Sequence, residues 1–157
     1  MIRFTLSADD DAWVQLIGKY MLNMGSVELM TRNIIYNMHG TDNVPVYSDT
    51  LAARMGYLRA RFPREPQSRH QWAMRVFGVA DKHLTFRNSV AHSSVVLHGD
   101  DAGPQRVVGL LDLTPRDPTN IGQIISIEEL TGRVNESSAI ARDLVTMQQD
   151  YTRATVV

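Results

Sequence analysis

The stretch that decides the fold is residues 67–92, which read QSRHQWAMRVFGVADKHLTFRNSVAH. Apolar side chains recur there every three or four residues, as on one face of a helix. A first stripe contains Trp72, Val76, Val79, His83, Phe86 and Val90, and a neighbouring stripe contains Phe77, Ala80, Leu84, Arg87 and Ala91. Two adjacent stripes predict a long helix that packs against the protein on more than one side.

Helical periodicity also extends toward the start of the chain. A capping sequence at Ser7 precedes apolar positions spaced three and four apart up to Met38, and Gly40 can end that helix. A shorter helix is predicted from Ser48 or Asp49 to Phe62, where Pro63 stops it.

The pattern changes after His92 to the two-residue alternation of strands. Residues 94–113 predict a β-hairpin around the turn Gly99 to Pro104, and residues 123–127 predict a further short strand. Ser126 and Glu129 then form a capping box for a last helix. The predicted fold is mainly α: an up-and-down bundle of about four helices in one domain, 1–157, with a β insertion at about 94–127.

Composition favours an ordinary globular protein of the cytoplasm. The 157 residues are 43% hydrophobic, carry a formal net charge of -1 and contain no cysteine, which fits a reducing compartment. Residues 1–11 hold an acidic cluster where a signal peptide would have an apolar run, and no window resembles a membrane span. We therefore expect no membrane partner.

The near-neutral total conceals a basic stretch. Between Arg54 and Arg87 there are eight basic residues and two acidic ones, an excess of six positive charges. Such a stretch is either a solvated helix face or a footprint for a polyanion. On the second interpretation, Arg59 and Arg64 are candidate RNA-binding residues.

The candidate catalytic residues lie at the end of the predicted helix 67–92. Arg87 lies on an apolar stripe, where burying an unpaired guanidinium is costly. Asn88 and His92 share one helix face, so Asn88 can orient the imidazole while Arg87 supplies a fixed cation. Alternatively, Arg87 and His92 only contact the last carbonyls of the helix.

Other familiar site patterns are lacking. The sequence has no phosphate-binding glycine loop, no dinucleotide fingerprint and no paired-cysteine zinc pattern, so we expect no cofactor and no metal site. His39 with Asp42 is interpreted as a turn, and His70, His83 and His98 as structural or solvent-facing.

The segment Phe86-Arg87-Asn88-Ser89-Val90-Ala91-His92 resembles the Arg-polar-x-x-x-His signature of the HEPN superfamily, in the form RNxxAH. The resemblance extends to a long first helix containing Glu28 and a capped final helix beginning Ser-Ile-Glu-Glu-Leu. It implies a helical homodimer with metal-independent endoribonuclease activity in toxin, phage-defence or RNA-processing systems. The catalytic residues would be Arg87, Asn88 and His92, the substrate RNA, and a protein antitoxin or regulatory protein a further partner.

Two alternatives stay open from the sequence. The first is a catalytically inactive HEPN-like module that dimerises or binds RNA or nucleotides. The second is a helical adaptor that recruits a protein along the edge of its hairpin.

Overall fold

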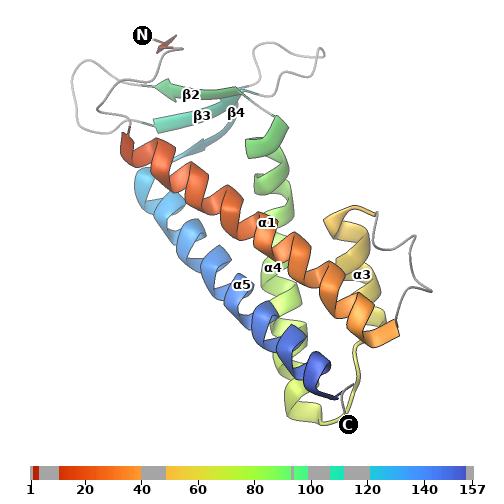
Figure 1. The fold of residues 1–157 in the computed structure, drawn as a ribbon. Coiled ribbons are helices and arrows are strands. Elements are labelled where there is room, and N and C mark those ends of the chain that lie inside the picture. Colours follow the sequence, from red (N-terminus) through yellow and green to blue (C-terminus); the bar gives the residue numbers. More distant parts are fainter. Residues whose placement is uncertain are drawn as a thin grey trace. The chain divides into compact units, whose positions relative to one another are not determined.

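The computed structural model describes residues 2–3, 11–39, 49–92, 94–98, 107–111 and 121–154. The side chains of His92, of the strand residues before Ile125 and of residues 151–154 lie outside the described part. The described residues are mainly helical, as the periodicity predicts. Four helices account for most of them: α1 (Asp11–His39), α3 (Leu51–Arg61), α4 (Gln67–His92) and α5 (Ile127–Ala154) (Figure 1).

Side-chain hydrogen bonds cap the starts of α3 and α5. The Thr50 hydroxyl accepts a hydrogen bond from the backbone N–H of Ala53 at 3.3 Å, and α3 begins at Leu51, two or three residues after the predicted Asp49 or Ser48. The Ser126 hydroxyl accepts the N–H of Glu129 at 3.1 Å, so the predicted cap of α5 is confirmed. The predicted cap at Ser7 lies outside the described residues.

Four short strands form one antiparallel sheet in the order β1-β2-β3-β4. They are β1 (Ile2–Arg3), β2 (Ser94–His98), β3 (Val107–Leu111) and β4 (Ile121–Ile125). The sequence did not indicate β1, because two residues are too few to show an alternation. The turn of the predicted hairpin lies outside the described residues, so the hairpin stays a prediction.

The chain divides into two compact units, each with its own buried residues. Unit 1 contains Met1–Met21 and Thr85–Asn135, and unit 2 contains Leu22–Leu84 and Glu136–Val157. The buried apolar residues of unit 1 are Trp13, Tyr20, Phe86, Ile125, Leu130 and Val134. Those of unit 2 are Met24, Val27, Ile34, Ile35, Leu51, Met55, Leu58, Phe62, Ala73, Val76, Phe77, Ala80, Ile140, Leu144 and Met147. That all 157 residues form one domain stays a prediction.

The pattern of burial follows the helical spacing. In α4 the fully or nearly fully buried positions include Ala73, Val76, Ala80 and His83, spaced three or four apart. Ala91 at the end of the helix is exposed. No helix in the described part of the chain is both long enough and apolar enough to cross a membrane.

We expect the core of unit 2 to dominate stability. Leu144 is fully buried, whereas Gln149 is exposed, and both lie on α5 within that unit. Leu144→Ala should lower the free energy of unfolding by about 2–5 kcal/mol because it opens a cavity. Gln149→Ala, the matched control, should change it by less than about 0.5 kcal/mol. Urea denaturation measures both, and equal losses would contradict the described packing.

Candidate functional site

The last turns of α4 carry Arg87, Asn88 and His92. Arg87 is half-buried and Asn88 is exposed. Nη1 of Arg87 donates a hydrogen bond to Oδ1 of Asn88 at 3.1 Å. His92 is the last residue of α4, and its side chain lies outside the described residues. The structure therefore brings Arg87 and Asn88 together, and the role of Asn88 toward His92 stays a prediction.

Phe86 anchors this part of α4 within unit 1. Its side chain is 2% exposed, and its ring meets the Tyr20 ring edge-on with 5.0 Å between the centroids. On α5, Cζ of Arg133 lies 4.3 Å from the centroid of the Phe86 ring, in cation–π geometry. Contacts to α1 and α5 thus fix the rotation of α4 about its axis and with it the direction of Arg87.

Tyr20 is a buried phenol close to two cations. Burial raises the pKa of Tyr20 well above its ordinary value of 10.0, and the positive charges of Arg133 and Arg87 only partly oppose this shift. The phenol therefore ionises only at strongly alkaline pH.

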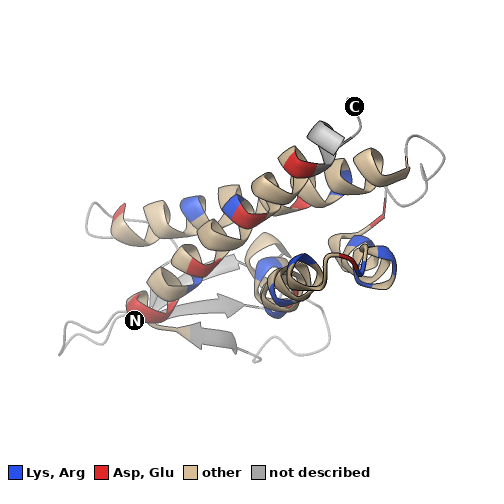
Figure 2. Ribbon diagram, turned by 90° about the horizontal axis from the view of Figure 1, so that it is seen from below, with Lys and Arg blue, Asp and Glu red and all other residues tan. Residues whose placement is uncertain are grey.

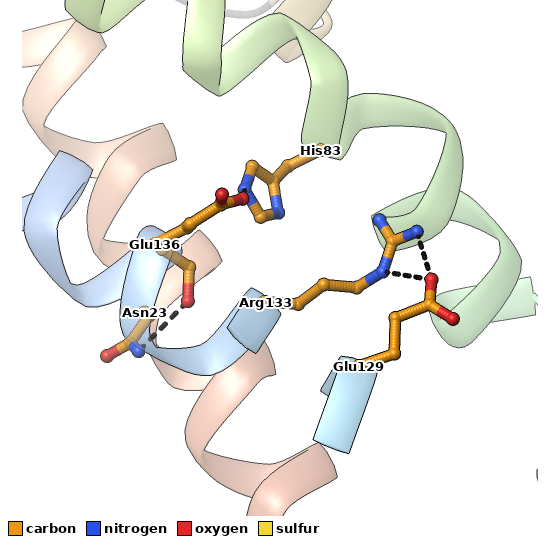
Figure 3. A network of polar contacts seen from close by, with 6 residues as sticks. Asn23, His83, Glu129, Arg133 and Glu136 are labelled. Atoms are coloured by element: carbon orange, nitrogen blue, oxygen red, sulfur yellow. Dashed lines mark hydrogen bonds and ion pairs between the residues drawn. The ribbon is translucent and has the colours of Figure 1, made fainter. Parts of the chain in front are cut away.

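Arg133 has a carboxylate partner one turn earlier on α5. Its Nε and Nη2 atoms donate to the same oxygen, Oε1 of Glu129, at 3.3 and 2.8 Å (Figure 3). The Arg133 side chain is 21% exposed and that of Glu129 46%. Sequence reasoning missed Arg133, although the spacing of Glu129 and Arg133 at i and i+4 is the pattern of a helical ion pair.

Two arginines of the basic stretch, Arg59 and Arg69, form ion pairs within unit 2. Nη1 of Arg59 lies 2.6 Å from Oδ2 of Asp81, and its Nη2 donates to the carbonyl oxygen of Phe77 at 2.9 Å. Arg69 forms an ion pair with Asp150 at 3.1 Å. These pairs reduce the positive charge that the stretch presents to a polyanion.

Of the two predicted RNA-binding residues, only Arg64 is exposed. It follows α3, whereas Arg59 is half-buried within the helix. Both belong to unit 2, and Arg87 belongs to unit 1. Figure 2 shows both basic and acidic positions on the long helices, whereas the charged residues of α3 are all arginines.

The histidines of unit 2 occupy structural positions. His83 is 1% exposed, and its Nε2 lies 3.2 Å from Oε2 of Glu136 (Figure 3). His70 Nδ1 lies 3.0 Å from the carbonyl oxygen of Pro63, and the His39 ring meets the Tyr57 ring edge-on. Within the described residues, no three His, Cys, Asp or Glu side chains are grouped as a metal site would require. Asp42, considered with His39 in the sequence, lies outside them.

Comparisons with known proteins assign no family to the chain. A scan against protein-family models, a search of curated proteins and a search of solved structures each found no match. The resemblance to HEPN domains rests on residues 86–92 and their helical context alone.

The raised pKa of Tyr20 predicts how the free energy of unfolding depends on pH. Because folding raises the pKa of Tyr20, its contribution is fully present below pH about 10 and is lost as pH rises through the folded-state value. Above pH about 10, the free energy of unfolding should therefore fall more steeply in the wild type than in Tyr20→Phe. Urea denaturation at a series of alkaline pH values measures both slopes, and parallel slopes would contradict burial of this phenol.

Proposed function

We propose that this chain is a metal-independent endoribonuclease of the HEPN type, with Arg87 and His92 as its catalytic pair. The observation that carries the proposal is the placement of Arg87 in the last turns of α4. There it is half-buried and hydrogen-bonded to Asn88, next to the buried Phe86, on the helix that ends at His92. A toxin or phage-defence setting is part of the proposal.

The reaction uses a nucleophile that RNA itself supplies. The ribose 2′-oxygen attacks the adjacent phosphorus as its proton is removed, and the bond from phosphorus to the 5′-oxygen breaks. The leaving 5′-oxygen takes up a proton, so the products end in a 2′,3′-cyclic phosphate and a 5′-hydroxyl. A histidine with an ordinary pKa of about 6.5 can donate or accept such a proton near neutrality. That is the role we propose for His92.

Arg87 would stabilise the charge that develops on the phosphorane. Its hydrogen bond to Asn88 Oδ1 restrains the guanidinium before substrate binds. A cation fixed in advance needs little reorganisation in the transition state, which is why such groups are effective catalysts. Asn88 then acts as a positioning residue for Arg87.

RNA would also contact residues of unit 2. Arg64 is exposed, whereas Arg59 would have to share its guanidinium with Asp81. We propose that both meet the phosphate backbone, with Arg64 the stronger contributor. Such contacts raise affinity without taking part in bond cleavage.

We further propose that two copies assemble with two-fold symmetry, so that each motif is completed by its partner. The support is a row of exposed apolar residues on α1 within unit 2. Leu22 is 74% exposed, and Leu29 and Tyr36, at successive seven-residue intervals, are each 52% exposed. At Gly25 an added Cβ would meet nothing within 4 Å, which leaves room for another helix to approach. Exposed apolar surface of this kind is typical of interaction sites.

Substitutions should separate proton transfer from phosphate binding. His92→Ala should reduce the single-turnover cleavage rate by about 10²–10⁴-fold and leave RNA affinity nearly unchanged, because the imidazole acts mainly in the transition state. Arg87→Ala should reduce both, since a cation attracts the phosphate in the ground state as well. Rates at saturating protein and binding to uncleavable RNA are the measurements.

The matched control for these variants is Arg64→Gln, which should weaken binding and leave the saturated rate unchanged. Cleavage by His92→Ala at the wild-type rate would exclude the proposed role of the histidine. In that case the remaining activity would belong to another residue or to a contaminant.

Self-association should be visible in solution. Light scattering coupled to size exclusion should give twice the chain mass of 17.7 kDa. Leu29→Glu places a charge in the exposed row and should shift the mass toward one chain, since burying that charge is costly. A wild type that elutes with the mass of a single chain would remove the two-fold part of the proposal.

A further inference from the structure

Arg61 differs from the other arginines of α3 in what its guanidinium contacts. Arg54 is buried and bonded to the Thr31 hydroxyl, and Arg59 is paired with Asp81. Arg61 is exposed, and its guanidinium lies over an aromatic ring. Within the described residues it forms no ion pair. The charge and the outward side of this guanidinium are therefore available to a ligand.

Tyr57 holds the Arg61 guanidinium in place. The two residues lie one turn apart on α3, and Cζ of Arg61 is 4.2 Å from the centroid of the Tyr57 ring. The π electrons of the ring attract the cation, and the contact restricts a side chain that would otherwise sample many rotamers. Tyr57 is half-buried, so the ring is itself restrained by the packing of unit 2. A planar cation is thus held at the surface before a ligand binds.

A second aromatic ring comes from the end of α1, which lies beside α3 (Figure 1). His39 is the last residue of α1 and is exposed, and its ring meets the Tyr57 ring edge-on with 5.6 Å between the centroids. All three side chains belong to unit 2. We call His39, Tyr57 and Arg61 the Tyr57 cluster. It combines two aromatic rings with one cation.

This combination of groups matches the chemistry of single-stranded RNA. Unpaired bases stack on aromatic rings and on the plane of arginine guanidinium groups, while nearby cations contact the phosphates. Arg64, three residues after Arg61, is exposed, and the adjacent Glu65 is exposed as well. In the part of the chain that the structure describes, Glu65 forms no ion pair with either arginine. A carboxylate ligand would engage the arginines alone, whereas an RNA base also uses the stacked arrangement.

We propose that the Tyr57 cluster is a stacking platform for a base of single-stranded RNA. The base lies on the side of the Arg61 guanidinium that faces away from Tyr57, so that the cation is held between two ring systems. The His39 ring supports Tyr57 in edge-on contact. The inference rests on the proposed function, because it takes RNA as the ligand. Every base has a π face, so the platform adds affinity and little sequence specificity.

Stacking and charge can be separated at Arg61. If the pair with Tyr57 only stabilises α3, the loss of the guanidinium leaves RNA binding unaltered. A phosphate contact depends on positive charge, which lysine retains, whereas stacking needs a planar group, which lysine lacks. Arg61→Lys therefore removes stacking and keeps the charge. A strand without bases reports the backbone contacts alone.

The test compares two short single strands of equal length and charge, both with 2′-O-methyl ribose so that neither has the attacking hydroxyl. One is an oligoadenylate, and the other is the same backbone without bases. Fluorescence anisotropy at several salt concentrations gives Kd and its salt dependence. Arg61→Lys should weaken binding of the oligoadenylate by about tenfold, as expected for the loss of one stacked base, and leave the salt dependence unchanged. The Kd of the base-free strand should change by less than about twofold, because the charge is kept.

Tyr57→Leu removes the ring that restrains Arg61 and should also weaken binding of the oligoadenylate more than that of the base-free strand. Arg142→Lys is the matched control, because Arg142 is an exposed arginine of unit 2 that lies over no aromatic ring within the described residues. It should leave the Kd of both strands unchanged. Thermal unfolding shows that each variant is folded at the temperature of the measurement.

Three results would overturn the inference: the same Kd values for Arg61→Lys as for Arg142→Lys, an equal loss of affinity for the two strands, or no RNA binding by the wild type. The second would make Arg61 a contact of the phosphate backbone. The third also removes the proposed function. Cleavage of ordinary RNA by the same wild-type preparation separates the remaining cases. Binding without cleavage counts against the ribonuclease and leaves the platform standing, whereas cleavage with an unaffected Arg61→Lys removes the platform alone.

Discussion

Burial of the Phe86 ring is the constraint on which the geometry of the candidate site depends. The ring is held by Tyr20 from α1 and by Arg133 from α5, so α4 has one favourable rotation in unit 1. Each step along a helix turns the side chain by about 100°, so this rotation also fixes the half-buried orientation of Arg87. A residue one position away from a buried aromatic ring can keep its charged head near solvent while its stem is buried. Arg87 has this placement, and Asn88 restrains it there.

The arginines of the chain differ in the groups that their guanidinium groups contact. Arg59 and Arg69 lie within 4 Å of aspartates, and Arg54 is buried with Nε 3.4 Å from the Thr31 hydroxyl. These side chains tie together segments of unit 2 that are far apart in sequence. Arg87 instead donates to the neighbouring Asn88, and Arg133 pairs with Glu129 on its own helix and lies over the Phe86 ring. A count of basic residues cannot separate these uses, because the separation depends on which partner each guanidinium meets.

Local sequence signals predicted the helices well. Periodicity and the prolines located α3 and α4, and Ser126 located the start of α5, because these signals act within a few residues of the helix ends. The pairing of His83 with Glu136 and the contact of Arg133 with Phe86 join residues about 50 apart, and no local pattern indicates either one. The place of Arg87 on an apolar stripe can be seen in the sequence, and the structure places the side chain half-buried. Its neighbours Tyr20 and Arg133 follow only from the three-dimensional packing of unit 1.

The most direct test of the account is incubation of the purified protein with mixed single-stranded RNA in excess EDTA, followed by analysis of the product ends. We expect cleavage that leaves 2′,3′-cyclic phosphate and 5′-hydroxyl ends, and none when deoxyribose replaces the ribose at the cleaved position. Comparable cleavage of the deoxy substrate would contradict attack by the 2′-hydroxyl. Failure to cleave any RNA under conditions in which the protein is folded and dimeric would contradict the ribonuclease itself.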